Sequence, residues 1–189
     1  MSNSNNILTP APVDASQPEQ LNSSVKLPRG NYVVRCKKAE FQFSRKAGNP
    51  MFVLTWELCK PETVRVEGRV YSIAGVELRK QYLTLTPEAA KRTFELQSLL
   101  GLEQKVDLDN PLEAANKFVG QVANAFCGSD EYVKRADLTD EEIADGKTPD
   151  QAAPITYEDG SPVKGYTREL LQVLQKSSVT LPPLTGESM

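Results

Sequence analysis

The alternation of apolar residues between positions 31 and 43 constrains the fold more than any other feature of the sequence. Apolar side chains occupy even positions first and odd positions afterwards: Tyr32, Val34 and Cys36, then Ala39, Phe41 and Phe43. The phase changes at Lys37-Lys38, where a β-bulge would insert one extra residue into a strand. Because a bulge bends a long strand, this segment predicts the first strand of a small, strongly twisted β-barrel.

The following segments predict more strands and two helices. Residues 51–59 read as a strand with Phe52, Leu54, Trp56 and Leu58 inward and Val53, Thr55 and Glu57 facing the other way. Residues 63–74 read as a third strand with a bend at Gly68, and residues 78–85 and 121–127 as two more. A helix is expected from the cap at Thr86 to Gly101, and a shorter one from Asn110 to about Val119. Residues 167–175 fit either a helix or a closing strand.

This order of elements predicts a mainly β fold, an OB-fold-like barrel with one or two α-helices. Residues 1–26 are rich in Asn, Ser, Pro and Gln, and we expect a disordered leader there. The domain is expected to span 27–175 with an acidic insert at 129–153, followed by a flexible tail at 176–189.

The composition argues against catalysis. The 189 residues include no histidine, which removes the commonest general base and most catalytic zinc sites. Cys36, Cys59 and Cys127 lie in strand-like runs without CxxC spacing and read as reduced core residues. Asp107 with Asp109, and the run 140–142, are conceivable metal ligands, but both groups lie in polar loops and fit solvated acidic loops better. We therefore expect a protein that is not an enzyme and carries no metal or cofactor.

The net charge of −3 hides a segregation of charge along the chain. Residues 27–128 hold 15 Lys and Arg against 11 Asp and Glu, whereas residues 129–150 hold 3 against 8. The predicted barrel is therefore basic, and the predicted insert is acidic. A basic barrel is compatible with a nucleic-acid partner.

Cations and aromatic residues alternate on the predicted exposed positions. Single-stranded nucleic acid is bound by cations that follow the phosphates and by aromatic rings that stack on the bases. The candidate binding residues are Arg35, Lys37, Arg45, Lys46, Arg65, Arg69, Tyr71, Lys80 and Tyr82. Each cation taken alone also fits a solvated surface, and Tyr71 and Tyr82 also fit a cap over the core.

The run LPRGNYVVRCKKAEFQFSRKAGNPMFVLTWEL (27–58) resembles the opening of small single-stranded DNA-binding proteins from replication modules of tailed bacteriophages. The helix with Arg92 that ends in LLGL is also similar, and the likeness covers about 27–128. The resemblance implies an OB-fold, sequence-independent binding, and a role in phage DNA replication or recombination. It carries over Arg45 and Lys46 as DNA contacts. The end, LPPLTGESM, departs from the acidic tail by which many such proteins recruit partners.

The expected partners are single-stranded DNA and replication or recombination proteins, with self-association left open. No segment reaches the roughly 20 apolar residues that cross a bilayer, and the start lacks the pattern of a secretory signal. We therefore expect no membrane contact and a cytoplasmic location, in the host cell if the chain is encoded by a phage. The alternative functions are a non-catalytic protein–protein adaptor or phage assembly component and, with less support, a metal-dependent nuclease.

Overall fold

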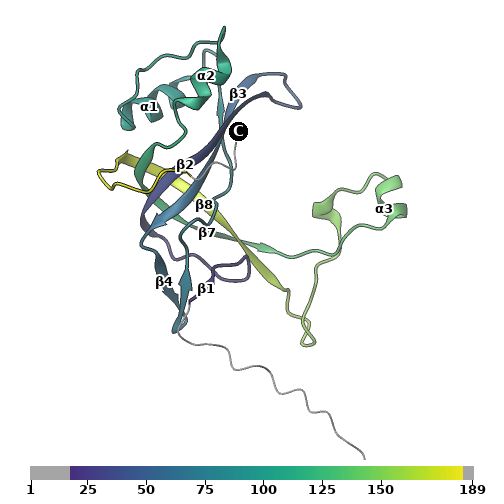
Figure 1. Ribbon diagram of the computed structural model, residues 1–189. Coiled ribbons are helices and arrows are strands. Elements are labelled where there is room, and N and C mark those ends of the chain that lie inside the picture. The colour runs from purple at the N-terminus through teal and green to yellow at the C-terminus, as the bar shows by residue number, and fades with distance from the viewer. Residues whose placement is uncertain (1–17, 185–189) are drawn as a thin grey trace, which may run out of the picture.

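The computed structural model describes residues 18–184, and it confirms a mainly β fold (Figure 1). The strands are β1 (Glu19–Gln20), β2 (Gly30–Phe43), β3 (Pro50–Lys60), β4 (Thr63–Val66), β5 (Arg69–Ser72), β6 (Gln81–Thr84), β7 (Val122–Val133) and β8 (Lys164–Lys176). The helices are α1 (Lys91–Leu99), α2 (Pro111–Asn116), α3 (Asp140–Ala144) and a 3-10 turn at Pro149–Gln151.

The larger sheet has the order β6-β3-β2-β7-β8, and every neighbouring pair is antiparallel. The helices α1 and α2 come between β6 and β7 in the chain, as an OB-like barrel requires. The two edge strands, β6 and β8, do not close the barrel with a ladder. These edges are joined by a backbone hydrogen bond from Arg79 N to Arg168 O (2.6 Å), an ion pair between Arg79 and Glu169 (3.4 Å), and packing by α1. The barrel is therefore partly open along this seam.

Strand β2 carries the predicted bulge. Its pairing with β3 shifts register between Cys36 and Lys38, at the position where the apolar phase changes. Before the shift, β2 pairs with both β3 and β7, and beyond it with β3. The bulge thus bends β2 so that one strand serves two sides of the barrel. Phe43 is a correction: it has the inward parity, but it lies at the end of the hairpin and is exposed.

Strand β3 lies in the middle of the core. Trp56, predicted to be inward, is fully buried, and its indole Nε1 donates to Gln81 Oε1 at 3.0 Å. The residues predicted to face away from the core do so, yet they are buried as well: Val53, Thr55 and Glu57. Charged residues of β2 lie opposite them in the register: Arg35 opposite Glu57, Lys38 opposite Thr55 and Glu40 opposite Val53.

The segment predicted as one bent strand at 63–74 is two strands. Glu67 (φ 50°) and Gly68 (φ 82°) both adopt positive φ and form a two-residue turn between β4 and β5. Two consecutive residues with positive φ are typical of a type I′ hairpin turn, which reverses the chain instead of bending it. The hairpin pairs with β1, in parallel, to make the small sheet β1-β5-β4.

The main helix begins later than predicted. Thr86 O accepts hydrogen bonds from the N–H groups of Ala89 and Ala90, which form a turn, and α1 begins at Lys91. The second helix begins at Pro111, as predicted. The side chains of Thr93, Leu96 and Gln97 form the buried face of α1.

Strands β7 and β8 continue beyond the barrel as a two-stranded arm, which Figure 1 shows projecting away from the rest of the molecule. Strand β7 runs to Val133, so the acidic insert begins as a strand, and α3 near the arm tip is capped by Thr139. The ambiguous segment 167–175 is a strand. Two register shifts leave Leu171 and Leu174 without partners in β7, and this disrupts the period of two that would have identified it.

Both ends of the described chain lie against the barrel. Glu19 and Gln20 pair with β5 and Leu21 is buried, so order begins before Leu27, the predicted boundary; residues 1–17 of the predicted leader lie outside the described residues. At the other end, Ser177 N donates to Val122 O at 2.9 Å. Of the predicted tail, residues 185–189 lie outside the described part. Between residues 18 and 184 we find no helix with the length and apolar character to cross a membrane.

Candidate nucleic-acid interface

The nine predicted binding residues lie in three separate places. On or beside the outward side of β2, β3 and β6 lie four of them: Arg35, Lys37, Lys80 and Tyr82. The loop between β2 and β3 carries Arg45 and Lys46, and the β4–β5 hairpin carries Arg65, Arg69 and Tyr71. They do not form one continuous trough, and each place has its own geometry.

We call the outward side of β2, β3 and β6 the outer face. The register of the strands sets three rows across it: Arg35 with Glu57; Lys38 with Thr55; and Glu40 with Val53 and Tyr82. Lys37 sits at the bulge, and Lys80 directly precedes β6. The face therefore carries four cations against Glu40, Glu57 and Glu77.

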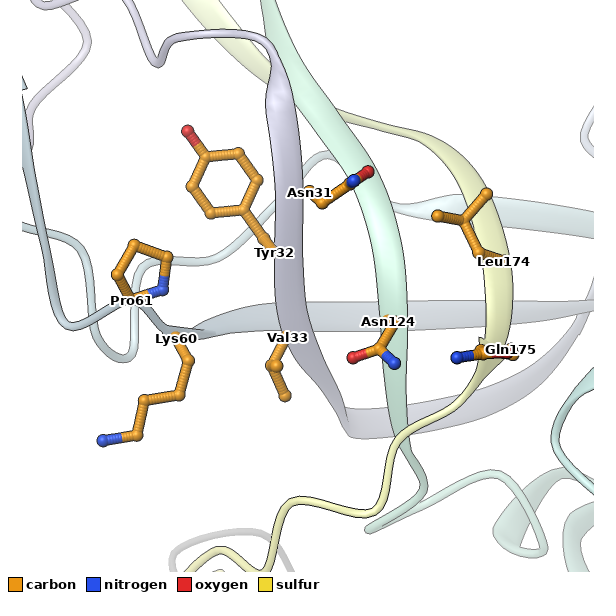
Figure 2. Close-up of a pocket in the computed structure, with 8 residues that line it drawn as sticks. All are labelled: Asn31, Tyr32, Val33, Lys60, Pro61, Asn124, Leu174 and Gln175. Carbon is orange, nitrogen blue, oxygen red and sulfur yellow. The ribbon is translucent and has the colours of Figure 1, made fainter.

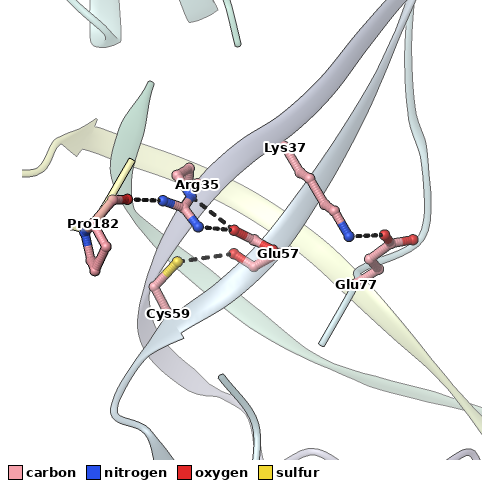
Figure 3. A network of polar contacts seen from close by, with 6 residues as sticks. All are labelled: Arg35, Lys37, Glu57, Cys59, Glu77 and Pro182. Carbon is pink, nitrogen blue, oxygen red and sulfur yellow. Dashed lines mark hydrogen bonds and ion pairs between the residues drawn. The ribbon is translucent and has the colours of Figure 1, made fainter. Parts of the chain in front are cut away.

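Arg35 is a structural residue of this face. Its guanidinium donates from Nε and Nη2 to Glu57 Oε1 at 2.8 and 2.5 Å, and the two side chains are 17% and 7% exposed (Figure 3). The remaining nitrogen, Nη1, donates to Pro182 O at 2.5 Å. The C-terminal segment therefore crosses the outer face here. With its nitrogens engaged, Arg35 is not available to a phosphate in this arrangement.

The lysines of the outer face also have glutamate partners. Lys37 Nζ lies 2.9 Å from Glu77 Oε1, and Glu40 is shared by Lys38 (2.8 Å) and Lys80 (3.8 Å). The hydrogen bond from Lys38 is the main reason that the pKa of Glu40 is lowered below its ordinary value. These pairs are solvent-exposed, unlike the Arg35–Glu57 pair, so solvent screens them and each stabilises the fold by about 0–1 kcal/mol.

Tyr82 is the exposed aromatic residue of this face. It is 57% exposed, and it lines a hollow of about 350 Å³ between β6 and α1 together with Arg92. Arg92 makes no ion pair with a residue in the described part of the chain. A ring and a guanidinium on one hollow suit a stacked base and its phosphate. Sequence reasoning placed Arg92 in the helix but did not select it, because the approach of α1 to β6 is a tertiary contact.

The loop between β2 and β3 presents Arg45 and Lys46. Both are exposed, and neither has an ion-pair partner among residues 18–184. The loop is held by two hydrogen bonds across its ends, Ser44 N to Asn49 O and Asn49 N to Ser44 Oγ. The exposed ring of Phe43 lies at the start of the loop, and it makes an edge-to-face contact with Phe41, with the ring centroids 5.3 Å apart. This loop therefore combines two uncompensated cations with an aromatic ring.

The hairpin residues do not share one side, contrary to the prediction. Reversal at Glu67-Gly68 puts Arg69 and Tyr71 on the face of Val64 and Val66, while Arg65 pairs with Val70 on the opposite face. Tyr71 is also only 7% exposed and packs in the core cluster, so its ring is not an open stacking surface. The expectation of one surface for all three side chains was wrong because it assumed a single strand.

Beyond Arg35, the outward sides of β2, β7 and β8 hold a pocket that the sequence did not reveal. The pocket has a volume of about 520 Å³, and Figure 2 shows the side chains that line it. They include the amides of Asn31, Asn124 and Gln175, together with apolar and charged neighbours at the end of β3. Phe126, directly opposite Asn31, is partly exposed on the same side. The sequence predicted a strand at 121–127, but none of the residues that line this pocket was among the candidate binding residues.

The acidic residues weighed as metal ligands have local roles. Asp107 accepts hydrogen bonds from the backbone N–H groups of Asp109 and Asn110, and the first of these is the main cause of its lowered pKa. Glu142 closes the capping box of α3 with Thr139. Within the described ranges no group of three metal-ligating side chains occurs.

The three cysteines differ in reactivity. Burial raises the pKa of Cys36 and Cys127 to about 12 and that of half-buried Cys59 to about 11. We therefore expect iodoacetamide at pH 8 to label Cys59 before the other two, because the thiolate is the nucleophile and the other sulfurs are also inaccessible. Peptide mass spectrometry over a time course would measure the order. Faster labelling of Cys36 than Cys59 would contradict this burial.

The raised pKa values also have a consequence for stability. A thiol whose folded pKa exceeds its unfolded value stabilises the fold fully below the unfolded pKa, near 8.5–9. This contribution is lost as the pH rises through the folded value. All three thiols shift in the same direction, so they contribute to a loss of stability between about pH 9 and 12.

Neither the known protein families nor the curated proteins include a match to this chain.

Proposed function

We propose that this chain is a non-catalytic protein that binds single-stranded DNA without sequence preference. It binds through the outer face, the Arg45-Lys46 loop and the hollow shared by Tyr82 and Arg92. The resemblance of residues 27–58 to phage single-stranded DNA-binding proteins extends the proposal to phage DNA replication or recombination in the host cytoplasm, with replication or recombination proteins as further partners.

The observation that carries this proposal is that Tyr82, Arg92 and Lys80 lie on or beside β6, with the separate Arg45-Lys46 loop leading into the neighbouring strand β3. On an OB-like barrel, β3 and β6 are the second and third strands, and oligonucleotides bind at this face and at the loop between the first two strands. Arg45, Lys46 and Arg92 have no ion pair among residues 18–184 and are ready for phosphates.

The glutamates of the outer face do not prevent binding. Because exposed ion pairs are weak, a phosphate can replace Glu40 as the partner of Lys38 or Lys80 at little cost. The buried pair between Arg35 and Glu57 is different, and we expect it to persist in the complex. The DNA path therefore runs over the exposed lysines and past Tyr82, leaving Arg35 in its structural role.

The test is the affinity for a fluorescent oligonucleotide as salt concentration rises. If five cations meet phosphates, as Arg45, Lys46, Arg92, Lys38 and Lys80 would, log K should fall against log salt with a slope of about −3 to −4. Tyr82→Ala should weaken binding at every salt concentration by the loss of about 1–3 kcal/mol of stacking. Tyr157→Ala is the matched control, since Tyr157 is similarly exposed (59%) but lies on the arm.

Glu40→Gln should strengthen binding, because it frees two lysines from one carboxylate. We expect the dissociation constant at low salt to fall by about threefold to tenfold, in line with the weak coupling of exposed pairs. Glu131→Gln removes the same charge from an exposed pair on the arm, with Lys164, and should leave the affinity nearly unchanged. Equal effects of the two variants would show that only net charge matters.

A protein-binding role is the second candidate, and the arm favours it. The arm exposes several large apolar side chains at and beyond the end of the paired strands: Tyr132, Val133, Ile143, Ile155 and Tyr157. If the chain is an adaptor or assembly component, it should show no retention on single-stranded DNA at physiological salt, and the Tyr82→Ala and Glu40→Gln variants should behave like the parent chain.

A further inference from the structure

A second pocket lies away from the outer face, between the β4–β5 hairpin and the segment that leads into β2. Its volume is about 660 Å³, within the range of small-molecule sites. The lining residues come from three parts of the chain: Ser24, Val25, Lys26 and Pro28; Val66, Glu67, Arg69 and Tyr71; and Tyr166 of β8. The reversal at Glu67-Gly68 puts Arg69 and Tyr71 on this side.

The hydroxyl of Tyr71 is the feature that points to a ligand. Only 7% of the residue's surface is exposed, and its ring packs in the core cluster. The hydroxyl itself is reached by solvent through the pocket, so it does not require a protein hydrogen-bond partner. Within residues 18–184 the Tyr71 hydroxyl has none, and the residue lines the pocket. The polar tip of an otherwise buried ring is thus unpartnered where the pocket opens.

Donors outnumber acceptors around this hydroxyl. Lys26 and Arg69 make no ion pair within the described part of the chain, and the Tyr166 hydroxyl likewise has no protein partner there. Lys134 Nζ adds a further cation nearby, since it donates to Ser24 Oγ at 3.3 Å. Glu67 is the one carboxylate in the lining. The lining supplies two cations and three hydroxyls, those of Ser24, Tyr71 and Tyr166, and this set favours an anion with several acceptor oxygens.

We propose that this pocket binds the phosphate group of a nucleoside monophosphate, either free or at the end of a DNA strand. The guanidinium of Arg69 suits bidentate contact with phosphate oxygens, with Lys26 as a second charge and Tyr71 as a hydrogen-bond donor. Glu67, at the pocket wall, accepts a hydrogen bond from a hydroxyl or amino group of the sugar or base. This chemistry selects an organic phosphate over an inorganic one.

The site is independent of the DNA-binding proposal. None of its lining residues belongs to the outer face, the Arg45-Lys46 loop or the hollow at Tyr82. The variants Tyr82→Ala and Glu40→Gln should leave nucleotide binding unchanged. Failure of either proposal can therefore be recognised while the other stands.

The test is isothermal titration calorimetry of the full chain in chloride buffer with adenosine 5′-monophosphate, adenosine, inorganic phosphate and a 5′-phosphorylated trinucleotide. We expect adenosine to bind at least about tenfold more weakly than its monophosphate, as loss of charge-assisted hydrogen bonds predicts. Tighter binding of the trinucleotide identifies a strand end as the ligand, and equal or weaker binding identifies the free nucleotide. Equal affinity for adenosine and its monophosphate would overturn the proposal.

Three variants locate the site. Arg69→Gln should weaken binding of the monophosphate by about tenfold or more, and Tyr71→Phe, which keeps the packed ring, by about threefold to tenfold. Arg65→Gln is the matched control, because Arg65 lies on the opposite face of the same hairpin and carries the same charge. It should leave the affinity unchanged. Equal losses for Arg65→Gln and Arg69→Gln, or full affinity in Tyr71→Phe and Arg69→Gln, would refute the site.

Discussion

Replacing Trp56 by alanine is expected to lower the free energy of unfolding by about 3–5 kcal/mol, the usual range for removing a fully buried aromatic side chain. The indole occupies the centre of β3, inside the barrel, and its neighbours come from several strands that cannot all move to fill the space. Its N–H also partners Gln81 Oε1, which would lose its donor inside the protein. Equilibrium unfolding in urea, followed by circular dichroism, would measure the loss.

The control for Trp56→Ala is Tyr157→Ala, which removes an exposed ring from the arm. Surface substitutions of this kind usually change stability by less than about 0.5 kcal/mol. A loss of less than about 1 kcal/mol in the free energy of unfolding of Trp56→Ala would contradict the packing of β3 against the core.

Arg35→Met should be nearly as damaging, although the sequence pattern predicts Arg35 as a DNA contact. The substitution leaves the Glu57 carboxylate buried without its partner, and breaking a buried ion pair from one side typically costs about 3–5 kcal/mol. The carbonyl of Pro182 would lose its donor as well, so the C-terminal segment should become more mobile. Urea unfolding measures the first effect, and hydrogen exchange at residues 177–184 measures the second.

A double variant separates loss of the pair from loss of packing. Arg35→Met with Glu57→Met replaces both charges by apolar groups and should regain most of the stability lost in the single variant. Lys37→Met is the exposed comparison, because the Lys37–Glu77 pair lies in solvent, and it should cost about 1 kcal/mol or less. A small effect of Arg35→Met, equal to that of Lys37→Met, would contradict the structural role of Arg35.

The parts of the fold that were predictable are those in which neighbouring residues carry the information. The bulge in β2 is visible because the apolar phase changes within one strand, and Trp56 shares its parity with three other core residues. The turn at Glu67-Gly68 was missed because a glutamate rarely adopts positive φ, so the segment read as continuous. Strand β8 was ambiguous because its two register shifts place leucines at helix-like spacing.

The candidate site was less predictable, because the availability of a cation depends on its partner across the sheet. Nothing near Arg35 in the chain indicates that Glu57 stands opposite it, or that Pro182 lies 147 positions away in sequence and in contact. Tyr71 had the right parity for exposure on a flat strand, but its ring packs in the core cluster that also includes Leu21 and Leu27. Arg45 and Lys46 were easier, since a short loop between two strands is exposed in any barrel.

The seam between β6 and β8 allows local opening of the barrel. Because one backbone hydrogen bond, one ion pair and α1 bridge the two edges in place of a ladder, the wall can widen there while every ladder of the large sheet stays intact. Amide protons along the unpaired edges should consequently reach deuterium sooner than those of β2, which is flanked on both sides. Arg79 and Glu169 form an ion pair across that rim, and these charges discourage the edges from pairing with a neighbouring molecule.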